Sequence, residues 1–581
     1  MNNSGIIETN KNPDLVTFTV LLGGKELSKS HQVLSIVVSK EVNRIPMAQL
    51  VLLDGEASAQ DFVLSNEDLL IPGQEIEIKA GYHLDEETIF KGTIVKHNIK
   101  IRSKTSHLII ECKDEAIKMT VGRKSHYFYE SKDSDIFEEI IDTYGLEKDV
   151  ESTNYEHPEL IQYNSTDWDF MLSRAQATGK ICFVDDGKIS VKKPDLGQSE
   201  LETIAFGSSM LDFDGEIDAR NQISKVTSYS WSPSDQELVE VEGNDPAVSL
   251  NGNLSASDLA GVVGLKNMEL RHGGNLNDVE LQDWADATFL YQQLAKTRGR
   301  VKFQGIATVK PDTMLNLEGV GDRFNGKVYV TGVMHTISDG NWTTDAQFGL
   351  NPTWFSESYE INTPPASGLI PAIKGLHIGV VTQLEEDPEG EERILVKVPI
   401  VNNDEKGIWC RVSTLDAGDN RGSFFRPELE DEVIIGFINE DPNDPVVLGM
   451  LHSSAKPAPL VAADDNHEKG FFTRSEMKIL FDDDKISVTI ETPGGKIFTM
   501  DEDAGEIRIE DENSNIITMD SDGIVMESAG DISITATGDV TIEGMNVSIA
   551  ANAEFKAEGS AGAEMSTGAI AVLKGSIVQI N

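Results

Sequence analysis

The chain has 581 residues, which is too long for one hydrophobic core and predicts roughly three to five domains. Its formal net charge of −49 at pH 7 argues against nucleic acid as a partner and against charge-driven binding to an anionic membrane. Three widely spaced cysteines, Cys112, Cys182 and Cys410, predict free thiols in a reducing compartment.

The N-terminal stretch "MNNSGIIETNKNPDL" lacks a basic segment followed by an apolar run, so we expect no secretory signal. The chain has no run of about 18 apolar residues, which argues against a membrane span. We therefore expect assembly in the cytoplasm, and export would need a route other than a cleaved signal.

Residues 1–125 predict a β-rich domain. Short alternating or apolar runs such as "LVTFTVLL", "SIVVSK", "EIEIKAGY" and "IFKGTIVKHNIKI" are separated by Gly, Asn, Asp and Pro.

Helix signals follow this domain. One helix is expected with Ser134 as its cap and Gly145 as its stop, and a second with Thr166 as N-cap and Gly179 just beyond its end. A third is predicted over 279–297, with one shared face formed by Leu281, Trp284, Thr288, Tyr291 and Leu294.

The pattern predicts a protein that is mainly β with a few helices. After the first domain (1–125) we divide the chain into a helix-containing subdomain (126–210), a second β-rich domain (211–370), a small OB-type barrel of five short strands (376–455), a linker (456–477) and a C-terminal segment (478–581).

The C-terminal segment contains a repeat of apolar pairs, each pair lying on one face of a strand. Successive pairs are separated by seven or eight residues, with turn-forming residues between them. The pairs are Ile524/Met526, Ile532/Ile534, Val540/Ile542, Val547/Ile549, Phe555/Ala557, Ala563/Met565, Ile570/Val572 and Val578/Ile580, and the series extends backward less regularly to Val488/Ile490.

So short a repeat differs from the common solenoids, whose repeats begin at about twenty residues. One chain with such strands cannot close a core, whereas three chains wound around one axis can. The repeat therefore predicts an intertwined trimeric β-helix, or β-prism, that forms a needle about 60 Å long with the apolar pairs on its axis. An ordinary β-meander and a single-chain β-helix are the alternatives.

Three stretches carry a resemblance to a known family. They are "SFFRPELEDEVIIGFINEDPNDPVVLGMLHSSAKPAP" (423–459), "YNSTDWDFMLSRAQATG" (163–179) and "DRFNGKVYVTGVMHTIS" (322–338). With the repetitive tail, they make the chain resemble the VgrG-type spike proteins of contractile injection systems and the fused hub and spike of contractile phage tails. The chain departs from the family pattern at Glu430 and Glu440, where glycine is usual.

The resemblance implies a structural homotrimer that connects a hexameric inner tube to a puncturing tip. By the resemblance, 1–125 and 211–370 would be two barrel-like domains that form a pseudo-sixfold hub, the OB barrel would be a collar, and the needle would be the piercing element. Implied partners are the tube protein, baseplate proteins, effector cargo and a PAAR-like tip protein, which would dock on Ile577, Val578, Gln579, Ile580 and Asn581. A type VI system, an extracellular injection particle and a phage tail all fit.

Motifs for catalysis are absent from the sequence: it has no GxSxG, P-loop or HExxH. We therefore expect a non-enzymatic protein without a cofactor. A structural ion on the needle axis stays open, although "EDAGE" (502–506) and "DSDG" (520–523) lack the full calcium-loop spacing. The alternative function, a trimeric tailspike enzyme for surface polysaccharide, would need paired carboxylates and aromatic platforms, and 478–581 has no Trp or Tyr.

Overall fold

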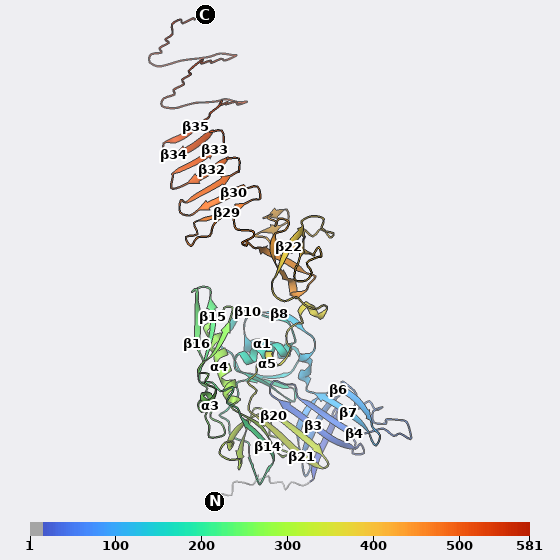
Figure 1. The fold of residues 1–581 in the computed structure, drawn as a ribbon. Helices are drawn as coiled ribbons and strands as arrows, with labels where there is room; N and C mark the ends of the chain where they lie inside the picture. The colour runs from blue at the N-terminus through green and yellow to red at the C-terminus, as the bar shows by residue number, and fades with distance from the viewer. Residues whose placement is uncertain (1–14, 581) are drawn as a thin grey trace. The chain divides into compact units, whose positions relative to one another are not determined.

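A computed structural model describes residues 15–580 (Figure 1). The chain forms two compact units, one reaching to Ile373 and including Asn439–Pro442, the other comprising Lys374–Ile438 and the chain from Asn443 onward. Within the described residues, no helix has the length and apolar character needed to cross a membrane.

The first unit is built on a thirteen-stranded sheet, in which eight consecutive neighbours pair antiparallel in the order β14-β18-β21-β20-β3-β4-β7-β6. These strands are β3 (Val33–Glu41), β4 (Met47–Leu53), β6 (Asp85–Ile101), β7 (Ser106–Lys113), β14 (Met210–Ile217), β18 (Thr297–Gln304), β20 (Gly326–Ser338) and β21 (Asn341–Phe348). The others are β1 (Val16–Leu22), β2 (Lys25–Glu26), β5 (Glu75–Tyr82), β13 (Glu202–Ala205) and β19 (Thr313–Glu318).

Two apolar cores lie against this sheet. One gathers residues of β1 and β3–β7, including Leu50 and Ile78, and the other gathers residues of β18–β21, including Phe303 and Val330. The pairing of β3 with β20 joins the two parts, so strands of both predicted barrel-like domains share one sheet. The boundaries predicted for those domains stay a prediction.

Two helices follow the first core. In α2 (Asp167–Ala177) the Thr166 hydroxyl accepts from the backbone N–H of Asp169 at 3.0 Å, which confirms the predicted cap. The prediction for α1 (Asp133–Thr143) was wrong by two residues: its N-cap is Lys132, whose N–H donates to the Asp135 carboxylate at 3.2 Å. Ser134 lies inside this helix, and its N–H donates to the Thr153 hydroxyl instead.

The third helix, α4 (Asp278–Leu294), begins after Asn277, whose side chain caps it, and ends three residues before the predicted 297 because Thr297 already belongs to β18. Its predicted inner face is buried except at Trp284, which is half-buried. The helices α3 (Ala256–Val263) and α5 (Phe355–Ser358) were not predicted.

Smaller sheets comprise β8 (Lys124–Lys132) with β10 (Glu156–Ser165), β9 (Glu147–Val150) with β11 (Ile181–Asp185) and β12 (Lys188–Lys192), and β15 (Val226–Ser232) with β16 (Glu237–Glu242) and β17 (Met268–His272).

A buried histidine makes the first unit sensitive to acid. Burial, together with the charges of Lys40 and Lys310, lowers the pKa of His335 from 6.5 to about 3. Its contribution to stability is complete above pH 6.5 and is lost as the pH falls toward 3, because only the unfolded chain takes up the proton. At pH 4.5 we expect a loss of about 2–3 kcal/mol from this residue. Urea unfolding at pH 7 and pH 4.5 should show a smaller acid-induced loss in His335→Gln than in the wild type, and equal losses would contradict it.

The second unit begins with a closed five-stranded barrel, as predicted. Its order is β22-β23-β24-β28-β27, and its core contains Val381, Val396 and Ile435. The strands are β22 (His377–Gln383), β23 (Ile394–Lys397), β24 (Ile408–Val412), β27 (Glu432–Phe437) and β28 (Pro445–Met450), and a short hairpin, β25 (Ala417–Gly418) with β26 (Arg421–Gly422), lies between β24 and β27 in the chain.

The next segment, 468–527, is an antiparallel meander (Figure 1). Its strands are β29 (Glu468–Phe472), β30 (Lys478–Asp482), β31 (Ser487–Glu491), β32 (Ile497–Asp501), β33 (Glu506–Glu510), β34 (Ile516–Asp520) and β35 (Gly523–Glu527). The single chain thus pairs its strands within this segment, as in the β-meander alternative, and the trimeric arrangement stays a prediction. The predicted linker 456–477 is too long, because β29 pairs with β30.

The meander has a period that the sequence analysis missed. Strands β30, β32 and β34 begin at Lys478, Ile497 and Ile516, which are 19 residues apart, and β31 and β33 keep the same spacing. Each period is one strand, a four-residue loop, a second strand and a five-residue loop.

Residues 528–580 form no strand in the single chain (Figure 1). Nearly all their side chains are exposed, so this segment has neither a core nor a strand partner of its own.

Candidate assembly surfaces

One face of the meander is a continuous apolar surface. Cross-strand register places two columns of side chains there, Phe471, Ile479, Ile490, Phe498, Ile509, Ile517 and Met526 in the first and Phe481, Val488, Met500, Ile507, Met519 and Ile524 in the second. The opposite face carries a central column of Gly470, Leu480, Thr489, Thr499, Arg508, Thr518 and Val525, which is polar from Thr489 to Thr518. Ten of these thirteen side chains on the apolar face are exposed, from 37% at Ile507 to 69% at Ile524, so one chain leaves most of the apolar face uncovered. Such a sheet needs a packing partner.

The predicted axial residues fall into two groups. Ile524 and Met526 lie on this apolar face, and Ile532 lines the same hollow of about 1070 Å³ as Phe498, Ile509 and Met526. The others follow in the segment without strands, where all are exposed: Ile534, Val540, Ile542, Val547, Ile549, Phe555, Met565, Ile570, Val572, Val578 and Ile580. Their place on a trimer axis stays a prediction.

The residues predicted to bind a tip protein lie at the end of this segment. Ile577, Val578, Gln579 and Ile580 are exposed and outside any strand, and Asn581 lies outside the described residues. Their docking role also stays a prediction.

The eight antiparallel strands of the large sheet consist of two four-strand units with the same topology. In chain order the units are β3, β4, β6, β7 and β14, β18, β20, β21. In both, the spatial order is first, second, fourth, third: β3-β4-β7-β6 and β14-β18-β21-β20. The units stand end to end, joined where β20 pairs with β3.

Register shows that the two units correspond residue by residue. The pair Gln49 and Glu111 in the first unit corresponds to Arg300 and Gln347 in the second. Bulges fall at equivalent places: before Lys96 in β6 and Gly332 in β20, and before Ser35 in β3 and Asp212 in β14. Sequence reasoning missed this repeat because its units share register and few residue types.

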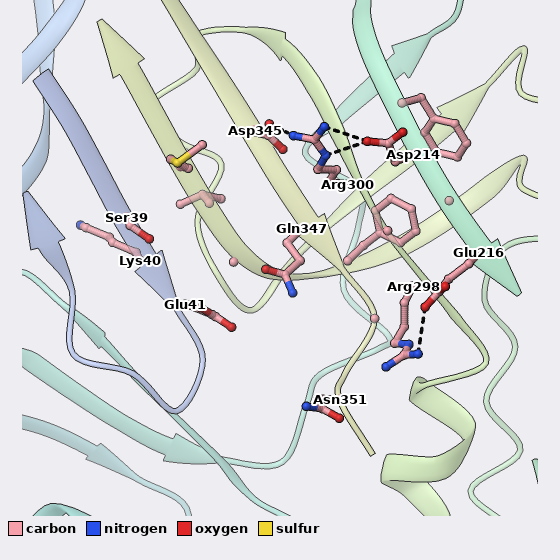
Figure 2. Close-up of a pocket in the computed structure, with 18 residues that line it drawn as sticks. Ser39, Lys40, Glu41, Asp214, Glu216, Arg298, Arg300, Asp345, Gln347 and Asn351 are labelled. Atoms are coloured by element: carbon pink, nitrogen blue, oxygen red, sulfur yellow. Dashed lines mark hydrogen bonds and ion pairs between the residues drawn. The ribbon is translucent and has the colours of Figure 1, made fainter. Parts of the chain in front are cut away.

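The polar face of the second four-strand unit (β14, β18, β20 and β21) is hollowed. A hollow of about 970 Å³ is lined by strands β14, β18, β21, β20 and β3. Figure 2 shows Arg300 between Asp214, at 2.8 Å, and Asp345, at 3.1 Å. Arg298 pairs with Glu216 at 2.8 Å. Burial raises the pKa of Asp345, and the positive charge of Arg300 offsets part of this rise. These charges compensate one another, and among residues 15–580 no three His, Cys, Asp or Glu side chains are grouped to hold a metal ion.

A buried ionic cluster ties α1, α2 and β10 together. The Arg174 guanidinium donates to both carboxylate oxygens of Asp133, at 2.7 and 2.9 Å, and the His157 Nε2 lies 3.1 Å from one of them. Burial alone would raise the pKa of Asp133, but the hydrogen bonds from His157 and Arg174 outweigh it and lower that pKa. The Asp133 carboxylate is only 3% exposed, so Arg174 and His157 compensate its charge in place of water.

Two family profiles match the chain. A profile described as "Alg8 N-terminal domain" matches residues 12–339, more than half of the chain, and one described as "Type VI secretion system/phage-baseplate injector OB domain" matches 377–452. The second match coincides with the closed barrel of β22–β28.

Curated relatives match over short segments. The type VI secretion system spike protein VgrG1a of Pseudomonas aeruginosa is 29% identical over 117 residues, which cover 18% of each protein. VgrG3 of Vibrio cholerae is 32% identical over 88 residues, 13% of this chain and 9% of the relative. The chain thus spans less than a fifth of the length of these relatives.

Among solved structures, the tail protein of Neisseria meningitidis MC58 has 14% identity and a TM-score of 0.44, covering 59% of this chain and 98% of that one. A chain of a Francisella PdpA-VgrG complex has 12% identity and a TM-score of 0.38, covering 88% of each chain. The chain belongs to the Alg8 N-terminal domain family, and its OB-domain match and curated relatives confirm its resemblance to the VgrG-type spike proteins.

Proposed function

We propose that three copies of this chain form the hub and spike of a contractile injection apparatus. The hub docks on a hexameric inner tube, and the needle pierces the target envelope. The observation that carries this proposal is the doubled four-strand unit. Three chains with two such units present six similar units, which is the number that a ring of six tube subunits can contact one to one.

Two features support the needle: the apolar face of the meander and the repeated apolar pairs in the segment after it. Three meanders can bury their apolar faces against one another around an axis, which removes this surface from water. From Ile524 onward, pairs at seven or eight residues let each chain supply a short strand in turn. The role is mechanical and non-enzymatic, with baseplate proteins, a PAAR-like tip protein and effector cargo as partners. Assembly in the cytoplasm precedes delivery on firing.

Light scattering on the purified protein tests the assembly. We expect three times the mass of one chain, and electron micrographs of the protein mixed with assembled inner tube of the same particle should show it at tube ends alone. A monomeric mass, or binding along the tube wall, would contradict the proposal.

A second test concerns the tip. Deleting residues 576–581 should abolish co-purification of the PAAR-like tip protein, because the exposed strand edges that it would cover are lost. The trimeric mass should remain, since all but the last apolar pair are retained. Unchanged co-purification would refute docking at this end.

A further inference from the structure

A hollow of about 280 Å³ in the first unit has aromatic walls. It is lined by residues of α2 and α4 and of the segment before α5. Its rings are those of Trp284 on α4, Trp354 directly before α5 and Tyr155 directly before β10, so they come from three segments far apart in the sequence. Trp284 is half-buried, unlike the rest of its helix face, because it lines this hollow.

Contacts behind the walls hold two of these rings in place. The Trp354 ring stacks on that of Tyr291 with centroids 6.3 Å apart, and the buried Tyr291 hydroxyl donates to the Lys180 carbonyl at 2.9 Å. The Tyr155 ring meets the His157 ring edge-on at 4.7 Å. These walls are therefore ordered before a ligand enters, which lowers the entropic cost of binding.

Three carboxylates line the same hollow, and two of them have partners. Asp133 accepts from the Arg174 guanidinium, as described above. Glu280 accepts from the side-chain amide of Asn277 at 2.5 Å and lies 3.7 Å from the His157 Nδ1. The negative charges of these two side chains are thus compensated from within the fold.

The third carboxylate, Asp283, has no such partner. It is half-buried, and within residues 15–580 it forms no hydrogen bond or ion pair. Burial raises its pKa, and the positive charge of Lys193 offsets part of this rise. Removing a carboxylate from water is costly unless a donor or a positive charge replaces the water. The hollow therefore combines one uncompensated negative charge with aromatic walls.

We propose that this hollow binds an organic ammonium group, with Asp283 as its counter-charge and the rings of Trp284 and Trp354 against its carbon atoms. Aromatic faces attract cations and repel anions, because the electron density above the ring is negative. A neutral apolar ligand would leave Asp283 without a partner. The group must be small, because cavities for larger ligands span about 300–1,000 Å³. This site adds a ligand to the function proposed above and does not depend on the trimer.

Isothermal titration calorimetry of the full chain tests the chemistry of the ligand. Choline carries the ammonium group on a free molecule, Nα-acetyl-lysine amide carries it on a protein side chain, and the tert-butyl analogue of choline, with carbon in place of nitrogen, lacks the charge. We expect the cations to bind and the uncharged analogue not to bind. Tighter binding of choline would assign the site to a small molecule, and tighter binding of the lysine amide would assign it to a lysine of a protein partner. Absence of binding by both cations, or equal binding of the uncharged analogue, would overturn the proposal.

Substitutions test the position of the site. Asp283→Asn should weaken binding of the preferred cation by about tenfold or more, because it removes the charge and keeps the shape. Asp278→Asn is the matched control, because Asp278 is exposed on the same helix and does not line the hollow. Trp284→Leu should also weaken binding, whereas Trp231→Leu, on β15, should not.

The melting temperature of each variant separates loss of the site from loss of the fold. We expect Asp283→Asn to melt close to the wild type, because this side chain has no partner to lose. Wild-type affinity in both Asp283→Asn and Trp284→Leu would refute binding in this hollow.

Discussion

Replacing Ile534 and Ile542 by aspartate should abolish the needle. In the single chain these side chains are 72% and 69% exposed, so the substitutions cost an isolated chain little. In the proposed trimer both lie on the axis, where each unpaired carboxylate would cost several kcal/mol in each of three copies. We expect residues 528–580 of the variant to be cleaved rapidly by a nonspecific protease that leaves the wild-type trimer intact.

The matched control is Ser533→Asp/Thr541→Asp, which adds the same charge at positions one residue away. In a strand these side chains point to the opposite face, into solvent, so protease resistance and melting temperature should hardly change. If the Ile534→Asp/Ile542→Asp variant retained trimeric mass, melting temperature and protease resistance, the assigned inward positions would be wrong.

Replacing Asp133 by alanine should destabilise the first unit by about 3–5 kcal/mol, because Arg174 then keeps its buried place without its carboxylate partner. The pKa of Asp133 is lowered in the folded protein. Its contribution to the free energy of unfolding is therefore present above the usual pKa of an aspartate and is lost as the pH falls through the lowered value. Urea unfolding at pH 7 followed by circular dichroism measures the change.

Asp142→Ala is the control for that experiment. Asp142 lies on the same helix and pairs with Lys148, but its side chain is 60% exposed, so its loss should be small. Equal unfolding midpoints for the Asp133→Ala variant and the wild type would show that the cluster does not hold α1 and α2 together.

The parts that could be predicted are those with local signals. Thr166 caps a helix because a hydroxyl three residues before a free N–H can accept from it, and this needs no tertiary contact. Strand β7 was missed because its hairpin tip, 102–105, contains no Gly, Pro, Asn or Asp. Lys132 caps α1 in place of Ser134 because Ser134 contacts Thr153, a partner distant in sequence.

The meander shows where the periodicity argument failed. Apolar pairs from Val488 to Ile517 follow one another at ten, nine and ten residues, which leaves four or five residues for each hairpin loop. From Ile524 the step shortens to seven or eight residues, and within the described residues no further hairpin forms. Both stretches alternate in the same way and were predicted as one segment. Step length alone does not separate them, because the seven-residue step from Ile517 to Ile524 still forms the β34–β35 hairpin.

The 19-residue period of the meander makes spike length adjustable in fixed increments. Each period contributes two strands, so duplicating residues 497–515 should lengthen the sheet by about 10 Å. Both strands of the copy would enter with their apolar side chains on the existing face, so the reach of the spike can change without redesign of its interior. The length of the meander can therefore change in steps of two strands.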